Sequence, residues 1–213
     1  IENYRKRASS FITMINYDKD REFWEDLYIS GDTTWDLGGP TPIFERLSKN
    51  INPGKLCILG CGKGHDAVMF AKKDFEVTAV DFSLSAINFL KKSADKEKVD
   101  IQILNTNIFD LTKEYYNQFN YIIEQTCFCA INPNMRNNYE KLVSNLLVKG
   151  GQLIGLWFPL DKHIDEGGPP WATSVREVKN LFSNNWIVER EEFSNLSINP
   201  RKDREKLIVF RKL

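Results

Sequence analysis

Three glycines and one aspartate are spaced as in a site for an adenosine-containing ligand. Gly60, Gly62 and Gly64 follow a short apolar run, and Asp81 lies 21 residues after Gly60, at the end of the next apolar run. Glycine lets the backbone turn tightly and approach a ligand with no Cβ in the way. In doubly wound nucleotide-binding folds, an acid about 20 residues after such a loop accepts hydrogen bonds from ribose hydroxyls. The four residues therefore predict an adenosine pocket.

The spacing of the glycines separates two ligands. A dinucleotide fingerprint would place its third glycine at position 65, which is His65, whereas here it is Gly64. The shorter spacing is usual for the loop that holds the methionine portion of S-adenosylmethionine, which has no pyrophosphate. An NAD-dependent oxidoreductase, a non-catalytic nucleotide-binding module and a glycine turn without a ligand stay as alternatives.

The elements that must position this loop alternate between strand and helix. Apolar runs predict strands over residues 56–59, 75–80, 99–104, 121–128, 152–158, 186–193 and 206–210. Helices are predicted over residues 67–72, 84–94, 135–146 and 174–182, and Gly150-Gly151 is expected to end the third of them. The order predicts a doubly wound α/β fold with a mostly parallel seven-stranded sheet, in which right-handed crossovers bring the strand ends to one edge.

The residues before this alternation predict a helical cover. A helix is expected over residues 18–29, with Trp24 and Tyr28 on one face. A loop of residues 31–41 carries Trp35, and Pro42 opens a short helix to Ser48. We expect one domain over 1–213, with a cover of about residues 1–50 and an α/β core of 51–213.

Composition favours small-molecule chemistry. Lys plus Arg equals Asp plus Glu at 29 each, so there is no basic excess of the kind that grips nucleic acid. No apolar run approaches the ~18–20 residues of a membrane span, and no secretory signal pattern is present. The four cysteines lack zinc-site spacing, so no metal is predicted. We expect a cytoplasmic protein, monomeric or weakly homo-oligomeric.

Several motifs in order resemble one known family. They are Phe23-Trp24-Glu25, Thr34-Trp35-Asp36-x-Gly38, Gly60-Cys61-Gly62-Lys63-Gly64-His65-Asp66, Phe128-Cys129-Ala130-Ile131-Asn132-Pro133-x-Met135-Arg136, Gly150-Gly151-x-Leu153-Ile154 and Gly167-Gly168-Pro169-Pro170. From Phe23 to the C-terminus, the chain resembles the thiopurine methyltransferase family, and within it the halide/thiol methyltransferases. Trp171 departs from that pattern, because tyrosine is frequent there.

The resemblance implies a class I methyltransferase of Rossmann-like fold that binds S-adenosylmethionine and releases S-adenosylhomocysteine. It implies that Trp24 and Trp35 help to wall the pocket, which suits a sulfonium because cations are attracted to aromatic faces. Asn107 and Ile108 would meet the adenine edge, and Gln125 would lie beside the methionine part.

The expected reaction is in-line methyl transfer to a small soft nucleophile. A thiol or hydrosulfide is the first candidate, and a halide or a thiopurine is the alternative. A thiol with a pKa near 8.5 is already a few per cent thiolate at neutral pH, so a strong base is not essential. The candidate catalytic residues are His163, as a base with a pKa near neutral, Trp171, as part of an aromatic acceptor pocket, and Glu124 on the fourth strand.

Overall fold

The structure, a computed structural model, describes residues 20–213 and contains one seven-stranded sheet in the order β3-β2-β1-β4-β5-β7-β6. Strands β1 to β5 are parallel, and β7 is antiparallel to both of its neighbours. The strands are β1 (Lys55–Leu59), β2 (Glu76–Asp81), β3 (Ile101–Asn105), β4 (Phe119–Gln125), β5 (Leu147–Trp157), β6 (Trp186–Glu192) and β7 (Lys206–Lys212). The predicted doubly wound, mostly parallel sheet is confirmed.

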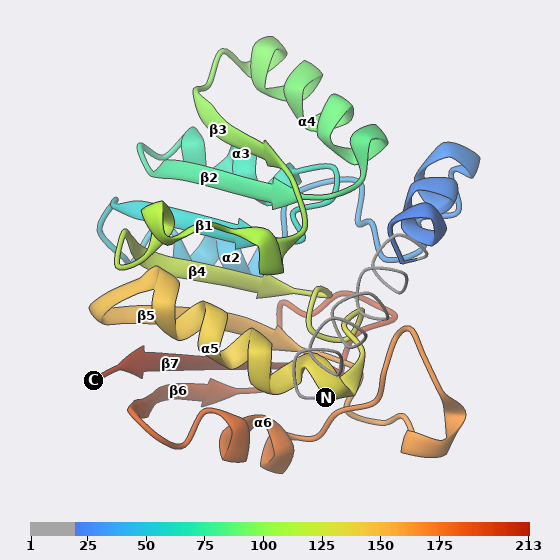
Figure 1. The fold of residues 1–213 in the computed structure, drawn as a ribbon, viewed down its shortest axis with the longest axis vertical. Helices are drawn as coiled ribbons and strands as arrows, with labels where there is room; N and C mark the ends of the chain where they lie inside the picture. Colours follow the sequence, from blue (N-terminus) through green and yellow to red (C-terminus); the bar gives the residue numbers. More distant parts are fainter. Residues whose placement is uncertain (1–19) are drawn as a thin grey trace, which may run out of the picture.

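Helices cover both faces of the sheet (Figure 1). They are α2 (Pro42–Leu47), α3 (His65–Ala71), α4 (Leu84–Glu97), α5 (Arg136–Leu146) and α6 (Val175–Leu181), with short 3-10 turns η1 (Ile108–Asp110), η2 (Lys113–Tyr115), η3 (Pro133–Met135) and η4 (Ile164–Glu166). A further helix covers residues 20–30 and lies beyond the C-terminal ends of the parallel strands. No helix within residues 20–213 is long and apolar enough to cross a membrane.

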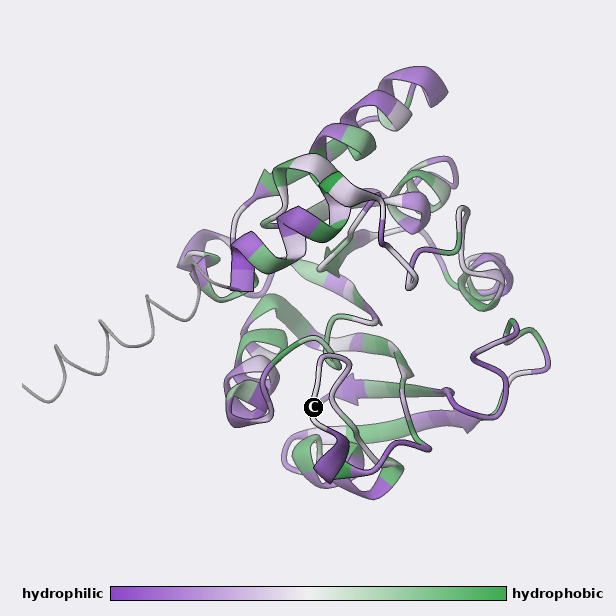
Figure 2. Cartoon of the chain, turned by 90° about the vertical axis from the view of Figure 1, so that its right-hand side faces the viewer, coloured by the Kyte–Doolittle hydropathy of each residue, from purple (hydrophilic) through white to green (hydrophobic). Residues whose placement is uncertain are grey.

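The buried strands contribute side chains to two separate cores because neighbouring side chains along a strand point to opposite faces. In β1, Cys57 and Leu59 belong to the core under α5 and α6, whereas Leu56 and Ile58 belong to the core under α2 and α3. The helices are correspondingly amphipathic, carrying hydrophilic and hydrophobic residues side by side in Figure 2. Burial on both faces explains why the parallel strands read as nearly continuous apolar runs.

The glycine pair after α5 corrects one prediction. Helix α5 ends at Leu146, and Gly150-Gly151 lies inside β5 instead of ending the helix. Leu147 already has an extended backbone, is fully buried, and pairs with Phe119 of β4. The pairing register shifts over the next residues, so the glycines accommodate an irregularity in the strand. Tertiary pairing overrides the local helix-stop signal.

The fourth strand is also shorter than predicted. It ends at Gln125 rather than at Phe128, because Thr126 takes a φ of 57° and turns the chain. Cys127 and Cys129 therefore lie in the turn after β4. The turn is stabilised by Phe128, whose backbone N–H donates to Glu124 Oε1 at 2.9 Å.

Substitution of Gly64 tests the packing between the glycine loop and α4. Gly64 has a φ of 73°, and a Cβ there would collide with the Leu90 side chain. Gly150 has a φ of 79°, and a Cβ there would meet nothing within 4 Å. A left-handed backbone costs alanine about 1–2 kcal/mol and overpacking about 1–3 kcal/mol more. We expect Gly64→Ala to lose about 2–5 kcal/mol of unfolding free energy and Gly150→Ala about 1–2 kcal/mol, measured by urea denaturation. Equal losses would contradict the steric argument.

Candidate active site

The glycine loop connects β1 to α3 and has no side chain at three of its positions. Gly60, Gly62 and Gly64 all have left-handed φ values, between 53° and 73°. A Cβ on Gly60 would lie 2.9 Å from Cys127 Sγ, and one on Gly62 would lie 2.7 Å from the Tyr28 hydroxyl. Glycine is therefore required here both by the backbone conformation and by the close approach of neighbouring side chains.

Asp81 fixes this loop through a buried carboxylate at the end of β2. Its Oδ2 accepts a hydrogen bond from the Gly62 backbone N–H at 2.8 Å, and its Oδ1 accepts one from the Ser83 N–H at 2.9 Å. Burial raises the pKa of Asp81 to about 6, and the nearby Glu25 charge acts in the same direction. The carboxylate predicted for ribose recognition therefore lies directly against the glycine loop, as its spacing indicated.

Three aromatic rings of the cover lie together, and one of them reaches the loop. Trp35 packs edge-on against Trp24 and Tyr28, with ring centroids 5.0 and 5.6 Å apart. Its Nε1 donates to the Tyr28 hydroxyl at 3.3 Å, and that hydroxyl lies beside Gly62. Burial and then the Asp81 charge raise the pKa of Tyr28, so it stays a neutral phenol.

Tyr28 was missed as a site residue by the sequence reasoning. The available signal was its spacing of four residues from Trp24, which places both rings on one helix face.

The side chains that follow the glycines hold the cover in place. Asp36 forms an ion pair with Lys63 at 2.7 Å and lies 3.1 Å from His65 Nε2. Thr41 donates through its N–H and its hydroxyl to the two oxygens of Asp66, at 2.7 and 2.8 Å. Burial raises the pKa of Asp66 to about 6. The loop motif thus supplies both the glycine loop and the attachment points of its cover.

The helix of residues 20–30 has its own attachment to the sheet domain. Glu25 accepts hydrogen bonds from the hydroxyls of Ser83 and Ser85, at 2.7 and 2.6 Å. These serines stand at the N-terminus of α4, where unpaired N–H groups favour a carboxylate. The helix that carries Trp24 and Tyr28 is therefore fixed beside Asp81.

Asn107, Ile108 and Gln125 complete the same edge. Asn107 lies two residues after β3, and its Oδ1 accepts from the Phe109 N–H at 3.0 Å to cap η1. Ile108 is buried, and Gln125 ends β4. Within residues 20–213, the buried Gln125 Nε2 has no hydrogen-bond partner. Because β3, β2, β1 and β4 are neighbouring parallel strands, these residues share the C-terminal sheet edge with the glycine loop and Asp81.

Glu124 is engaged within the core rather than at the cover. Its side chain accepts from the Phe128 N–H at 2.9 Å and from the Tyr139 hydroxyl at 2.7 Å, one on each oxygen. The residue is 1% exposed, and burial raises its pKa to about 7. These contacts fit a carboxylate that orders the β4–α5 turn.

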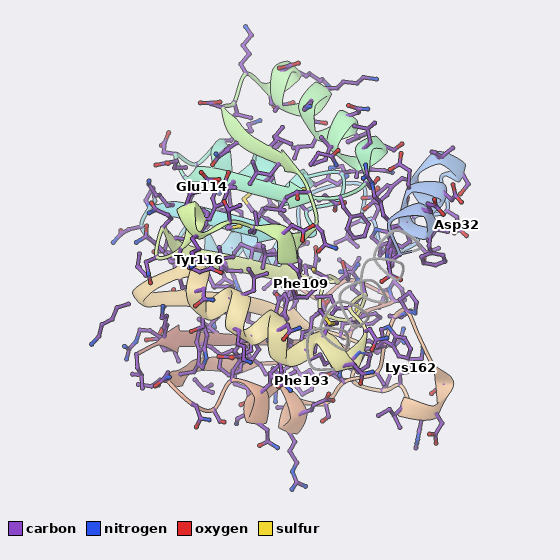
Figure 3. All side chains as sticks on the ribbon, viewed as in Figure 1. Asp32, Phe109, Glu114, Tyr116, Lys162 and Phe193 are labelled. Atoms are coloured by element: carbon purple, nitrogen blue, oxygen red, sulfur yellow. The ribbon has the colours of Figure 1, made fainter. Side chains whose placement is uncertain are left out.

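The loop after β5 carries Trp171 and His163 in different settings. The backbone N–H of Trp171 donates to the Cys129 carbonyl at 2.7 Å, which joins this loop to the turn after β4. His163 is exposed and begins η4, where its N–H donates to Glu166 Oε1 at 2.6 Å. Lys162, labelled in Figure 3, donates to the Pro170 carbonyl at 2.8 Å within the same loop. The structure thus links Trp171 to the site edge and leaves His163 in contact with its own loop.

Glu124→Gln tests the structural assignment of that carboxylate. A glutamine has one acceptor oxygen, so its amide NH2 would face one of the two donors, at a cost of about 1–3 kcal/mol. We expect that loss in the unfolding free energy at pH 7, measured by denaturant titration. Glu45→Gln on the exposed side of α2 is the control and should change it by less than about 0.5 kcal/mol.

The cost of Glu124→Gln should also depend on pH. The pKa of Glu124 is raised above its ordinary value of 4.5, so between pH 4.5 and 7 the folded state binds more protons than the unfolded state. That contribution to stability is largest at low pH and is lost as pH rises through about 7. The difference between wild type and variant should therefore shrink from pH 5 to pH 8; a constant difference would show that Glu124 does not titrate there.

Solved structures share this fold. The structure titled "Conversion of a Disulfide Bond into a Thioacetal Group during Echinomycin Biosynthesis" superposes with a TM-score of 0.73 at 22% identity, covering 90% of this chain and 92% of that one. A Burkholderia thailandensis 1,6-didemethyltoxoflavin-N1-methyltransferase, solved with S-adenosylhomocysteine, gives a TM-score of 0.73 at 16% identity and covers 92% and 89%. At these identities the likeness establishes the methyltransferase fold.

Sequence relatives narrow the assignment. The chain is 35% identical over 193 residues to a "Probable thiol methyltransferase 2" of Arabidopsis thaliana, covering 86% of this chain and 82% of that protein. It is 32% identical to a "Thiocyanate methyltransferase 1" of Brassica oleracea, covering 89% and 84%. The family model for thiopurine S-methyltransferase matches residues 19–212. The chain therefore belongs to the thiopurine S-methyltransferase family and is an S-adenosylmethionine-dependent methyltransferase.

Proposed function

We propose that this enzyme methylates the sulfur of a small thiol or of hydrosulfide. The observation that carries the proposal is the aromatic group of Trp24, Tyr28 and Trp35, packed together beside the glycine loop. Aromatic faces attract a sulfonium cation and offer a soft anion an apolar setting that excludes water. The relative named a thiol methyltransferase supports the same acceptor class.

The residues at the sheet edge fit the cofactor. The left-handed glycines carry no side chain that would shield the loop backbone from a ligand, and each Asp81 oxygen retains acceptor capacity for a ribose hydroxyl. The Gln125 Nε2, which has no hydrogen-bond partner among residues 20–213, can donate to the methionine part, and Ile108 gives an apolar contact for adenine. When bound, S-adenosylmethionine supplies the electrophilic methyl group on its sulfonium.

The chain contributes positioning and desolvation in this scheme, without a dedicated base. Reacting atoms must be held about 3–3.5 Å apart, which a rigid wall such as Trp35 can impose. A thiol is partly ionised at neutral pH. The exposed His163 is not needed for that ionisation, and Glu124 is occupied by the turn after β4.

A second candidate acceptor is an anion that carries no proton. The relative named a thiocyanate methyltransferase favours this class, in which a halide also falls. A bulkier thiol such as a thiopurine is the other alternative within the family. We further propose a cytoplasmic site of action, because all four cysteines are free, as thiols in a reducing compartment are.

An acceptor panel tests the proposal. The purified protein is incubated with S-adenosylmethionine and hydrosulfide, methanethiol, a thiophenol, iodide, thiocyanate or a thiopurine, and S-adenosylhomocysteine release is measured. We expect kcat/KM for a small thiol or hydrosulfide to exceed that for the thiopurine and the anions by at least tenfold. A faster reaction with iodide or thiocyanate would replace the thiol proposal with the anion one.

Asp81→Ala tests the cofactor placement independently of the acceptor. Loss of hydrogen bonds to a buried carboxylate costs about 2–3 kcal/mol, or roughly 30- to 150-fold in affinity. We expect a weakening of that size for S-adenosylhomocysteine in calorimetry. Asp95→Ala, on the exposed side of α4, is the control and should leave the affinity unchanged.

The affinity of the wild-type protein for S-adenosylhomocysteine should also depend on pH through the ionisation of Asp81. Protonated Asp81 loses acceptor capacity, and its pKa is raised to about 6 in the unliganded protein. S-adenosylhomocysteine binding should therefore weaken as pH falls below about 6, whereas Asp81→Ala should bind with little change over that range. Parallel profiles would contradict the assignment.

A further inference from the structure

A buried arginine from the far end of the chain binds the backbone of Trp35. Arg201 lies in the connection between β6 and β7 and is 5% exposed. Its Nη2 donates to the Trp35 carbonyl at 2.6 Å, across 166 positions of sequence. A charge-assisted hydrogen bond to a carbonyl is stronger than a neutral one. The cover is thus tied to the C-terminal part of the domain as well as to the glycine loop.

Arg201 is itself held by its own segment. Its Nη1 lies 4.0 Å from Glu205 Oε2, and Glu205 is 3% exposed. The Ser197 hydroxyl donates to the other Glu205 oxygen at 2.6 Å. The guanidinium also lies 5.8 Å from the ring centroid of Phe158, which follows β5. The guanidinium thus has a carboxylate and an aromatic ring beside it, and it donates a hydrogen bond to the Trp35 carbonyl.

The surroundings of this pair place it next to the candidate site. Arg201, Glu205 and Gln125 line one narrow pocket together with Leu37 and Thr41 of the cover. A buried ion pair is a costly way to tie down a loop, because desolvation consumes much of the Coulomb energy. A buried pair at this place is therefore better explained by a role in positioning a neighbouring group, here Trp35, than by stability alone.

We infer that Arg201, supported by Glu205, is a positioning residue that sets the place of the Trp35 ring in the cofactor wall. The inference rests on the proposed placement of the cofactor beside Trp35. Asp36 and Thr41 have their own partners, Lys63 and Asp66, and these contacts do not involve Arg201. Loss of Arg201 should therefore loosen Trp35 and the Trp24 contact without detaching the cover.

A double-mutant cycle between Arg201 and Trp35 tests this coupling. Calorimetry measures S-adenosylhomocysteine affinity for wild type, Arg201→Lys, Trp35→Ala and the combined variant. Lysine retains the positive charge but lacks the planar guanidinium, whose two terminal nitrogens face Glu205 and the Trp35 carbonyl. We expect about tenfold weaker binding for Arg201→Lys and about thirtyfold for Trp35→Ala. The combined variant should be no more than twofold weaker than Trp35→Ala alone.

Two further variants keep the test decisive. Arg201→Met with Glu205→Gln removes both charges and should repeat the effect of Arg201→Lys if the arginine fork is what matters. Arg204→Met is the matched control from the same segment, because Arg204 is more exposed and pairs with Asp161 at 2.7 Å. It should bind S-adenosylhomocysteine within twofold of wild type, and thermal unfolding verifies that each variant is folded.

The outcomes separate this inference from the proposed function. Weakening that multiplies in the combined variant would show that Arg201 acts independently of Trp35 and would overturn the inference. Unchanged affinity of Arg201→Lys, with Trp35→Ala weakened, would overturn it while leaving the cofactor placement intact. Unchanged affinity of Trp35→Ala would overturn the cofactor placement and this inference together. In the methyl transfer assay, a raised KM for the cofactor with kcat within threefold of wild type is the expected pattern for Arg201→Lys.

Discussion

The hydrogen bond between the Gly62 N–H and the Asp81 carboxylate is the contact on which the site depends. It joins the loop after β1 to the end of β2, and it forms only because those strands pair in parallel, with Leu59 opposite Val80. A carboxylate removed from water needs donors, and at this edge backbone amides supply them. The same bond holds the loop in a shape open to a ligand. Strand pairing, burial of Asp81 and the conformation of the glycine loop therefore depend on one another.

Charged side chains from three parts of the chain hold the cover against the glycine loop and the sheet. The glycine motif contributes Lys63 and Asp66, the start of α4 receives Glu25, and the C-terminal segment contributes Arg201. Partly buried ion pairs and charge-assisted bonds of this kind are directional, so they fix an orientation as well as a distance. The aromatic group of the cover thus takes its position from contacts that lie outside the aromatic residues.

Local patterns predicted those parts of the molecule that depend on local sequence. The apolar runs located every strand, and the spacing from Gly60 to Asp81 located the loop and its acid, because both signals lie within one strand–helix–strand unit. Long-range contacts were beyond that reasoning. Neither the hydrogen bond from Arg201 to Trp35 nor the one from Tyr139 to Glu124 is indicated by any residue spacing in the sequence. Gly150-Gly151 is a false helix-stop signal, because pairing of Leu147 with β4 outweighs that local pattern.

The use of the carboxylates constrains the chemistry that the site can perform. Asp81 and Asp66 hold the loop and its cover, and Glu124 holds the turn after β4, so the oxygens of each of these raised-pKa acids already accept hydrogen bonds from donors within the protein. A weakly acidic acceptor such as an alcohol would need a base, and proton transfer to one of these three acids would weaken the contacts that shape the pocket. An acceptor that ionises near neutral pH, or that is already an anion, makes no such demand. Under the proposed placement, the acceptor range follows from the structural use of the acids: soft nucleophiles that bring their own negative charge.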